Sequence, residues 1–151
     1  MARVRALSDS QVGDEERAAY EAAQRHHGWV PEPMMIWAHS PAVLRAATAL
    51  ERAAAATWKA VDPELVELAV LRGAQIIGCA WCIDFGTYLV RAGGTKAEKV
   101  ADLPRWRSSN AFGLRDRLVL EYAEAVSATP PRVTDELVER LSRLMKYAHS
   151  G

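Results

Sequence analysis

The sequence has no excess of charge of either sign and no long apolar run. Lys plus Arg number 19, as do Asp plus Glu, so the formal net charge is zero. Nothing in this balance points to a nucleic acid or an anionic membrane as a partner. No apolar run approaches the ~20 residues of a transmembrane helix. The polar stretch from Met1 to Gln11 lacks the apolar core of a signal peptide. We therefore expect a cytoplasmic protein.

The alternation of Val, Ile and Thr that marks β-strands is nearly absent. Alanine is abundant, and most Pro and Gly residues fall between apolar segments. These features predict an all-α fold, and a chain of 151 residues suits a single domain over residues 1–151. From caps and stop signals we expect helices over residues 14–27, 34–39, 41–60, 63–77, 79–92, 96–101 and 114–128, a loop over 103–110, and a last helix capped by Thr134.

Cysteine is scarce, but its two copies form one motif, Cys79-Ala80-Trp81-Cys82, at a predicted helix N-terminus. The free N–H groups and the positive end of the helix dipole at such a position stabilise a thiolate. The spacing also allows the two sulfurs to close a disulfide. Zinc needs about four ligands, and the sequence has no second pair of this kind, so we expect no metal. A redox-active pair, buried or vestigial cysteines, and a metal site remain as alternatives.

The block from Asp62 to Asp84 resembles the core of the alkylhydroperoxidase D / carboxymuconolactone decarboxylase family. Residues 103–107 and 122–125 also fit, and the similarity spans roughly residues 31–144. The resemblance implies an all-helical bundle that assembles into trimers or hexamers. Peroxidases of this family use a glutamate, two cysteines and a histidine four residues after the second cysteine. Their positions fall on Glu67, Cys79, Cys82 and Gly86, so the histidine is missing. By this resemblance, Cys82 would attack the peroxide, and Cys79 would resolve the resulting sulfenic acid to a disulfide.

The missing histidine bears on how Glu67 could reach the cysteines. If the two helices fold back at Gly78 as a hairpin, Glu67 lies across from residues 86–89. Four helical residues then leave an axial gap of roughly 6 Å to Cys82, which Gly86 cannot span. We hypothesise a thiol activated by the helix terminus, with Glu67 acting through water. Asp84 and Trp81 are candidate modulators of the thiol's reactivity. Alternatively, Asp84 is only an acid favourable to the helix N-terminus, and Trp81 only packs.

Three functions remain open from the sequence. The first is a thiol peroxidase or disulfide reductase, which would take a hydroperoxide or other small molecule, an external dithiol or protein reductant, and no cofactor. The second is lactone decarboxylation, which needs proton donors and an anion site. The third is a non-catalytic or redox-sensing helical oligomer. Similar proteins continue with a further core helix where this sequence closes with residues 145–151, so we expect a truncated chain or an apolar face covered by a partner subunit.

Overall fold

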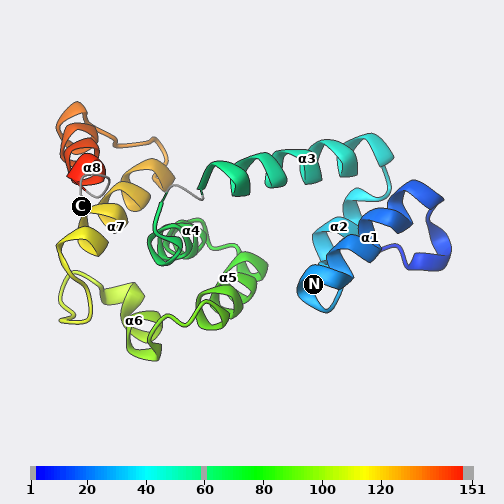
Figure 1. Cartoon of the computed structure of the whole chain (residues 1–151), viewed down its shortest axis with the longest axis horizontal. Helices are drawn as coiled ribbons and strands as arrows, with labels where there is room; N and C mark the ends of the chain where they lie inside the picture. The colour runs from blue at the N-terminus through cyan, green and yellow to red at the C-terminus, as the bar shows by residue number, and fades with distance from the viewer. Residues whose placement is uncertain (1–2, 59–60, 148–151) are drawn as a thin grey trace. The chain divides into compact units, whose positions relative to one another are not determined.

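The computed structural model describes residues 3–58 and 61–147, which form eight α-helices, two short 3-10 helices and no strand. The all-α prediction is therefore confirmed. The chain divides into two compact units, Met1–Thr57 and Trp58–Gly151, and Figure 1 labels the helices of each. None of the helices within the described ranges is both long and apolar enough to cross a membrane.

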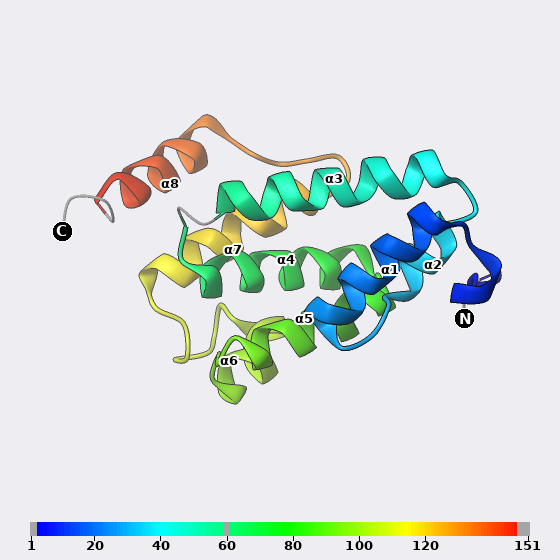
Figure 2. The same cartoon turned by 45° about the vertical axis from the view of Figure 1, so that its right-hand side comes forward.

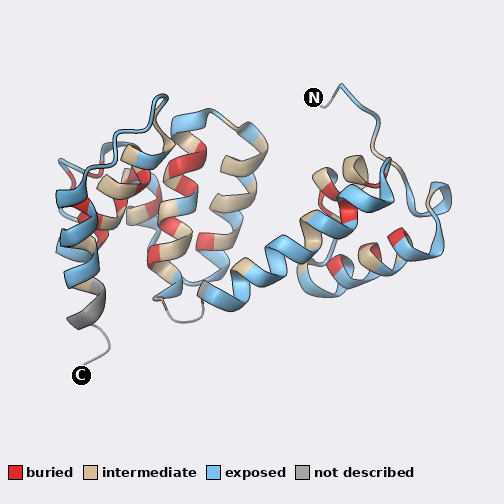
Figure 3. Ribbon diagram, turned by 90° about the horizontal axis from the view of Figure 1, so that it is seen from above, coloured by how far each residue is buried: buried red, intermediate tan, exposed pale blue. Residues whose placement is uncertain are grey.

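The first unit contains η1 (Asp9–Gln11), α1 (Asp14–His27), α2 (Glu32–Trp37) and most of α3 (Pro41–Trp58). Gly28, with a positive φ of 84°, ends α1 as expected. The small core of this unit consists of Tyr20, Ala23, Met34, Ala38 and Leu44. Beyond Leu44, α3 is largely exposed (Figure 3). Leu50 belongs with Leu44 and Ala47 to the apolar stripe that the sequence pattern predicts for this helix, and it is 71% exposed.

The second unit is built around α4 (Pro63–Ile77). This helix packs against both α5 (Ala80–Ala92) and α7 (Leu114–Ser127), as Figure 2 shows. The helix α6 (Ala97–Asp102) and the short η2 (Leu103–Arg105) follow α5, and α8 (Asp135–Tyr147) packs on α7. The main core brings together residues from α4 to α7, namely Leu68, Leu71, Val90, Val100, Leu103, Trp106, Phe112 and Leu120.

Side-chain caps explain where two of these helices begin. The Asp62 carboxylate accepts the N–H of Glu64 at 3.0 Å and starts α4, and the Thr134 hydroxyl accepts the N–H of Leu137 at 3.3 Å and starts α8. Both caps match the sequence signals. The sequence also predicts Thr95 as the cap of the helix expected over residues 96–101. This prediction is wrong, since Lys96 is the N-cap of α6.

Two other predicted boundaries concern the loop after α6 and the end of the long helix α3. The predicted loop over residues 103–110 begins with the turn η2. The expected end of the long helix at Ala60 lies outside the described residues, as do residues 148–151 of the closing segment.

A nearly buried carboxylate, Glu124, ties three segments of the second unit together. Its Oε1 accepts hydrogen bonds from Arg72 Nε and Nη2 at 2.8 and 2.6 Å and from Trp106 Nε1 at 2.9 Å. Arg107 pairs with the other oxygen at 2.5 Å. Burial alone would raise the pKa of Glu124, but these hydrogen bonds outweigh burial and lower it. The cluster therefore locks the turn after α6 to α4 and α7.

We expect Glu124→Ala to lower the free energy of unfolding by about 3 kcal/mol, because it leaves the Arg72 guanidinium nearly buried without its partner. Glu121→Ala, on the same helix, removes a pair with Arg140 whose side chains are 39% and 45% exposed. This control should cost at most about 1 kcal/mol. Urea unfolding of both variants measures the difference. Equal losses would show that the Glu124 cluster adds nothing beyond a surface ion pair.

Candidate functional site

The turn between α4 and α5 carries both cysteines. Gly78 adopts the left-handed conformation with a φ of 76°, and its N–H bonds to the carbonyl of Ala74, which ends α4. Cys79 follows with extended backbone and is the N-cap of α5. The predicted break at Gly78 and the predicted place of the motif at a helix N-terminus are both confirmed.

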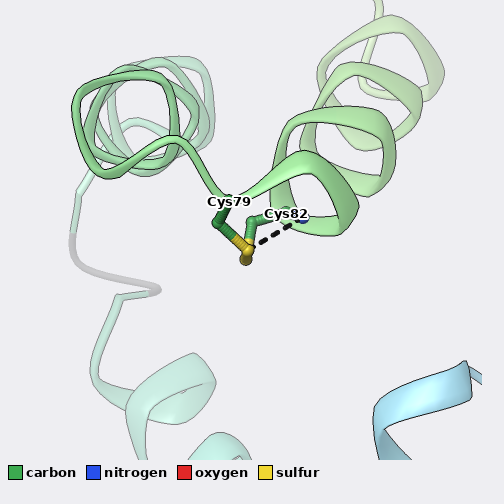
Figure 4. Close-up of a disulfide and its surroundings, with 2 residues drawn as sticks. All are labelled: Cys79 and Cys82. Carbon is green, nitrogen blue, oxygen red and sulfur yellow. Dashed lines mark hydrogen bonds between the residues drawn. A yellow bond between two sulfur atoms is a disulfide. The ribbon is translucent and has the colours of Figure 1, made fainter. Parts of the chain in front are cut away.

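The two cysteines are joined in a disulfide, with their Cα atoms 5.3 Å apart. Figure 4 shows the sulfurs at the corner between the two helices. The Sγ atom of Cys79 accepts a hydrogen bond from the backbone N–H of Cys82 at 3.3 Å. Both residues are half-buried. The site is therefore a closed sulfur pair that keeps some contact with solvent at a helix N-terminus.

Aromatic side chains follow the cysteine pair along α5. The ring of Trp81 stacks on Phe85 with centroids 4.8 Å apart, and Phe85 in turn contacts Tyr88 at 6.4 Å. This stacking accounts for the position of Trp81 within the helix, while a contact with substrate stays a prediction. Asp84 is exposed, and no acidic residue lies in the first turn of α5.

Gly86 occupies the position where the resemblance expects a histidine, and it is a packing point between α4 and α5. A Cβ atom at this position would lie 3.2 Å from Leu71 Cδ1 and 3.8 Å from Leu71 Cα. Leu71 is 1% exposed, so it has little room to move. The glycine thus lets the two helix backbones approach closely, and a side chain that could relay protons does not fit there without a shift.

Glu67 lies at the other end of the α4–α5 hairpin. A Cβ atom at Gly93 would lie 2.8 Å from Glu67 Oε2, so the carboxylate sits against the end of α5. Gly93 follows Cys82 by about three helical turns, or roughly 16 Å along the axis. A hairpin in which Leu71 faces Gly86 puts the backbone of Glu67 across from Val90, one residue beyond the expected range 86–89. The prediction is wrong for the carboxylate, which extends further along α5 and lies against Gly93.

The surroundings of Glu67 are acidic. Burial, and then the charge of Glu64, raise the pKa of Glu67. Lys99 pairs with Glu64 at 3.2 Å and with Asp116 at 3.0 Å, and a polar cleft of about 550 Å³ lies beside this cluster. No spacing signal in the sequence points to Lys99 or Asp116, because the fold brings them together from different helices. Within the described residues no group of three or more His, Cys, Asp and Glu is placed to hold a metal ion.

The sequence model of the carboxymuconolactone decarboxylase family matches residues 41–125, more than half of the chain. Two uncharacterized proteins are similar in sequence. YnjA of Escherichia coli (strain K12) is 33% identical over 119 residues, which are 79% of this chain and 65% of that protein. YdfG of Bacillus subtilis (strain 168) is 33% identical over 76 residues, 50% of this chain and 52% of that protein. The chain thus spans less than two thirds of the length of these relatives.

Two solved structures share the fold. The apo form of the debrominase Bmp8 has a TM-score of 0.80 at 19% identity, and the match covers 95% of this chain and 76% of that chain. A Cys-to-Ala variant of the same debrominase, in complex with 2,3,4-tribromopyrrole, also gives a TM-score of 0.80, at 18% identity and 75% coverage of that chain. At this identity the likeness supports the helical architecture and nothing finer.

The contact at Gly86 predicts that Gly86→His lowers the free energy of unfolding by about 1–3 kcal/mol, because the new side chain is forced against Leu71. Asp84→His places the same side chain at an exposed position of α5 and should change stability by no more than about 0.5 kcal/mol. Urea unfolding of the two variants makes the comparison. A Gly86→His protein as stable as the wild type would show that the position tolerates the relay histidine after all.

The environment of Glu67 predicts that Glu67→Gln stabilises the protein at neutral pH. A carboxyl whose pKa is raised by folding supports stability below its unfolded pKa of about 4.5, and this support is lost as the pH rises through the folded value. Gln imitates the protonated form, so the stability difference should be near zero below pH 4.5 and should favour the variant above it. Thermal unfolding across this pH range measures it. A variant less stable than wild type at pH 7 would contradict the prediction.

Proposed function

The chain belongs to the carboxymuconolactone decarboxylase family, and from that premise we propose that it is a thiol-dependent oxidoreductase that reduces small electrophiles, hydroperoxides foremost. One observation carries the proposal. Cys79 and Cys82 sit half-buried in a single turn at the N-terminus of α5 and close a disulfide without displacing the helix. A pair in this position can alternate between dithiol and disulfide, which is the chemistry of a two-electron reductant.

The reaction with a hydroperoxide balances within the pair. One thiolate attacks an oxygen of the O–O bond, which breaks and releases an alcohol, and the attacking sulfur becomes a sulfenic acid. The second thiol then attacks that sulfur, and water leaves as the disulfide forms. An external dithiol or a protein thiol reductant supplies two electrons to restore the pair. Neither a metal nor an organic cofactor enters these steps.

Activation of the thiol depends mainly on the helix terminus in this proposal. The first turn of α5 contains no acidic residue to oppose the thiolate. Glu67 takes no direct part, because its carboxylate lies against Gly93, about three helical turns from Cys82. We also propose assembly into trimers or hexamers. Ile77 and Leu114, 71% and 76% exposed in the chain, are apolar side chains suited to such contacts.

Reductive debromination is a second candidate. It is favoured by the fold shared with the debrominase Bmp8 over 95% of this chain and by the pairing of a cysteine variant of that protein with a tribromopyrrole. The same dithiol could serve here. A carbon atom exchanges bromine for a proton, bromide is released, and the two thiols become a disulfide. Lactone decarboxylation, which gives the family its name, uses no sulfur pair, and the cysteines therefore favour it less than the other two candidates.

The proposal predicts that one equivalent of an organic hydroperoxide converts the reduced protein to the disulfide form. Free-thiol counting should show the loss of both thiols, and mass spectrometry should show the loss of two hydrogens without added oxygen. With dithiothreitol as donor, the wild type should turn over, and a variant with both cysteines changed to Ser should not. Unreactive thiols would refute the peroxidase proposal.

The same assay with a bromopyrrole distinguishes the second candidate. Debromination would be favoured if the protein releases bromide and loses both thiols with the bromopyrrole but does not react with hydroperoxides. Thiols that react with neither substrate would leave a decarboxylase or a non-catalytic oligomer. Release of carbon dioxide from a lactone substrate would then identify a decarboxylase, and its absence would favour the non-catalytic oligomer.

A further inference from the structure

The structure distinguishes the two cysteines, and on the basis of the proposed function we infer that Cys79 is the attacking thiolate and Cys82 the resolving thiol. This assignment reverses the order that the family resemblance implies. It follows from the hydrogen bond that the Cys79 sulfur accepts at the start of α5. It also follows from the positions of Glu67 and Gly86, neither of which can assist Cys82.

Cys79 holds the position that stabilises an anion. It is the N-cap of α5, and its Sγ accepts the backbone N–H of Cys82 at 3.3 Å. This N–H belongs to the first turn of the helix, where backbone donors have no acceptor within the helix. The donor is therefore still available when the disulfide is reduced. A hydrogen bond to a charged sulfur is stronger than one to a neutral sulfur, so the arrangement favours ionisation of Cys79.

Cys82 is the third residue of α5, still in its first turn, and its sulfur has no hydrogen-bond donor comparable to the one that Cys79 has. Across the described residues, its Sγ accepts no hydrogen bond from another group. The two assisting positions that the family would provide are occupied otherwise. Gly86 is packed against Leu71 and Glu67 lies against Gly93. Without a base or a donor beside it, the Cys82 sulfur suits a resolving thiol that brings its own proton.

With these roles, each bond change in the reduction of a hydroperoxide falls on a named cysteine. The Cys79 thiolate attacks the terminal oxygen of the hydroperoxide, the O–O bond breaks, and the alkoxide takes a proton from water and leaves as the alcohol. The sulfenic acid on Cys79 is attacked by the sulfur of Cys82, whose proton leaves with the hydroxyl as water. In the disulfide that this step forms, the Cα atoms are 5.3 Å apart, within the usual range for such a bond.

The two single-cysteine variants should both fold, which makes the test practicable. Cys79→Ser places one of the preferred N-cap residues at the start of α5, and Cys82→Ser keeps the backbone N–H that donates to Cys79. Cys82→Ala is the matched control, because it keeps the same N–H and adds no hydroxyl near the Cys79 sulfur. Far-ultraviolet circular dichroism verifies the helix content of all three.

The decisive measurement is the pH dependence of alkylation by iodoacetamide, which needs no substrate. In Cys82→Ser and in Cys82→Ala, the remaining Cys79 should react with a midpoint at or below pH ~7.5. In Cys79→Ser, Cys82 should react with a midpoint near ~8.5. The midpoints should thus differ by about one pH unit or more. Equal midpoints, or a lower midpoint for Cys82, would overturn the assignment.

A second readout follows the oxidised sulfur. One equivalent of an organic hydroperoxide in the presence of dimedone should label Cys79 in Cys82→Ser, and mass spectrometry locates the adduct. A label on Cys82 in Cys79→Ser at an equal or higher rate would overturn the assignment. Failure of hydroperoxide to oxidise any of the proteins would refute the peroxidase proposal, while the alkylation midpoints would still decide which cysteine is the thiolate.

Discussion

The contact between Gly86 and Leu71 is the constraint on which the arrangement of the site depends. With no side chain at position 86, α5 approaches α4 until a Cβ atom there would lie 3.8 Å from Leu71 Cα. The contact occurs in the register set by the turn at Gly78, from which Leu71 and Gly86 lie almost equally far along the chain. This register places the cysteine pair at the closed end and the Glu67 carboxylate at the open end, beside Gly93. The site therefore lacks the relay histidine at position 86 and also holds the glutamate far from the sulfurs.

The two acidic centres of the second unit illustrate how burial and charge are balanced. Glu124 is surrounded by donors from two other segments, α4 and the turn after η2, and its charged form is favoured despite burial. Glu67 has the opposite environment, because burial and the nearby Glu64 both disfavour its charge. Carboxylates on neighbouring helices thus differ in character because of their partners. Only the first is positioned to hold the core together at neutral pH.

Local signals in the sequence predicted much of the fold. Asp62-Pro63 and Thr134 start helices as expected, and Gly78 ends α4 just before the cysteine motif. What failed depends on contacts between distant residues. The contact of the Glu67 carboxylate with Gly93 depends on how the side chains of α4 and α5 pack, and periodicity within either helix does not reveal it. The exposure of Leu50 and the gathering of Arg72, Trp106 and Arg107 around Glu124 are equally invisible to local patterns.

The shortness of the ring closed by Cys79 and Cys82 has a thermodynamic consequence. A cross-link restricts the unfolded chain in proportion to the logarithm of the loop that it closes, and a loop of this size accounts for only about 2 kcal/mol. Cross-links between distant segments restrict the unfolded chain much more. Breaking or forming this bond therefore changes conformational entropy little and leaves the backbone bonds of α5 in place. In the proposed function, this turn stores and releases two electrons with only a small change in the conformational entropy of the unfolded chain.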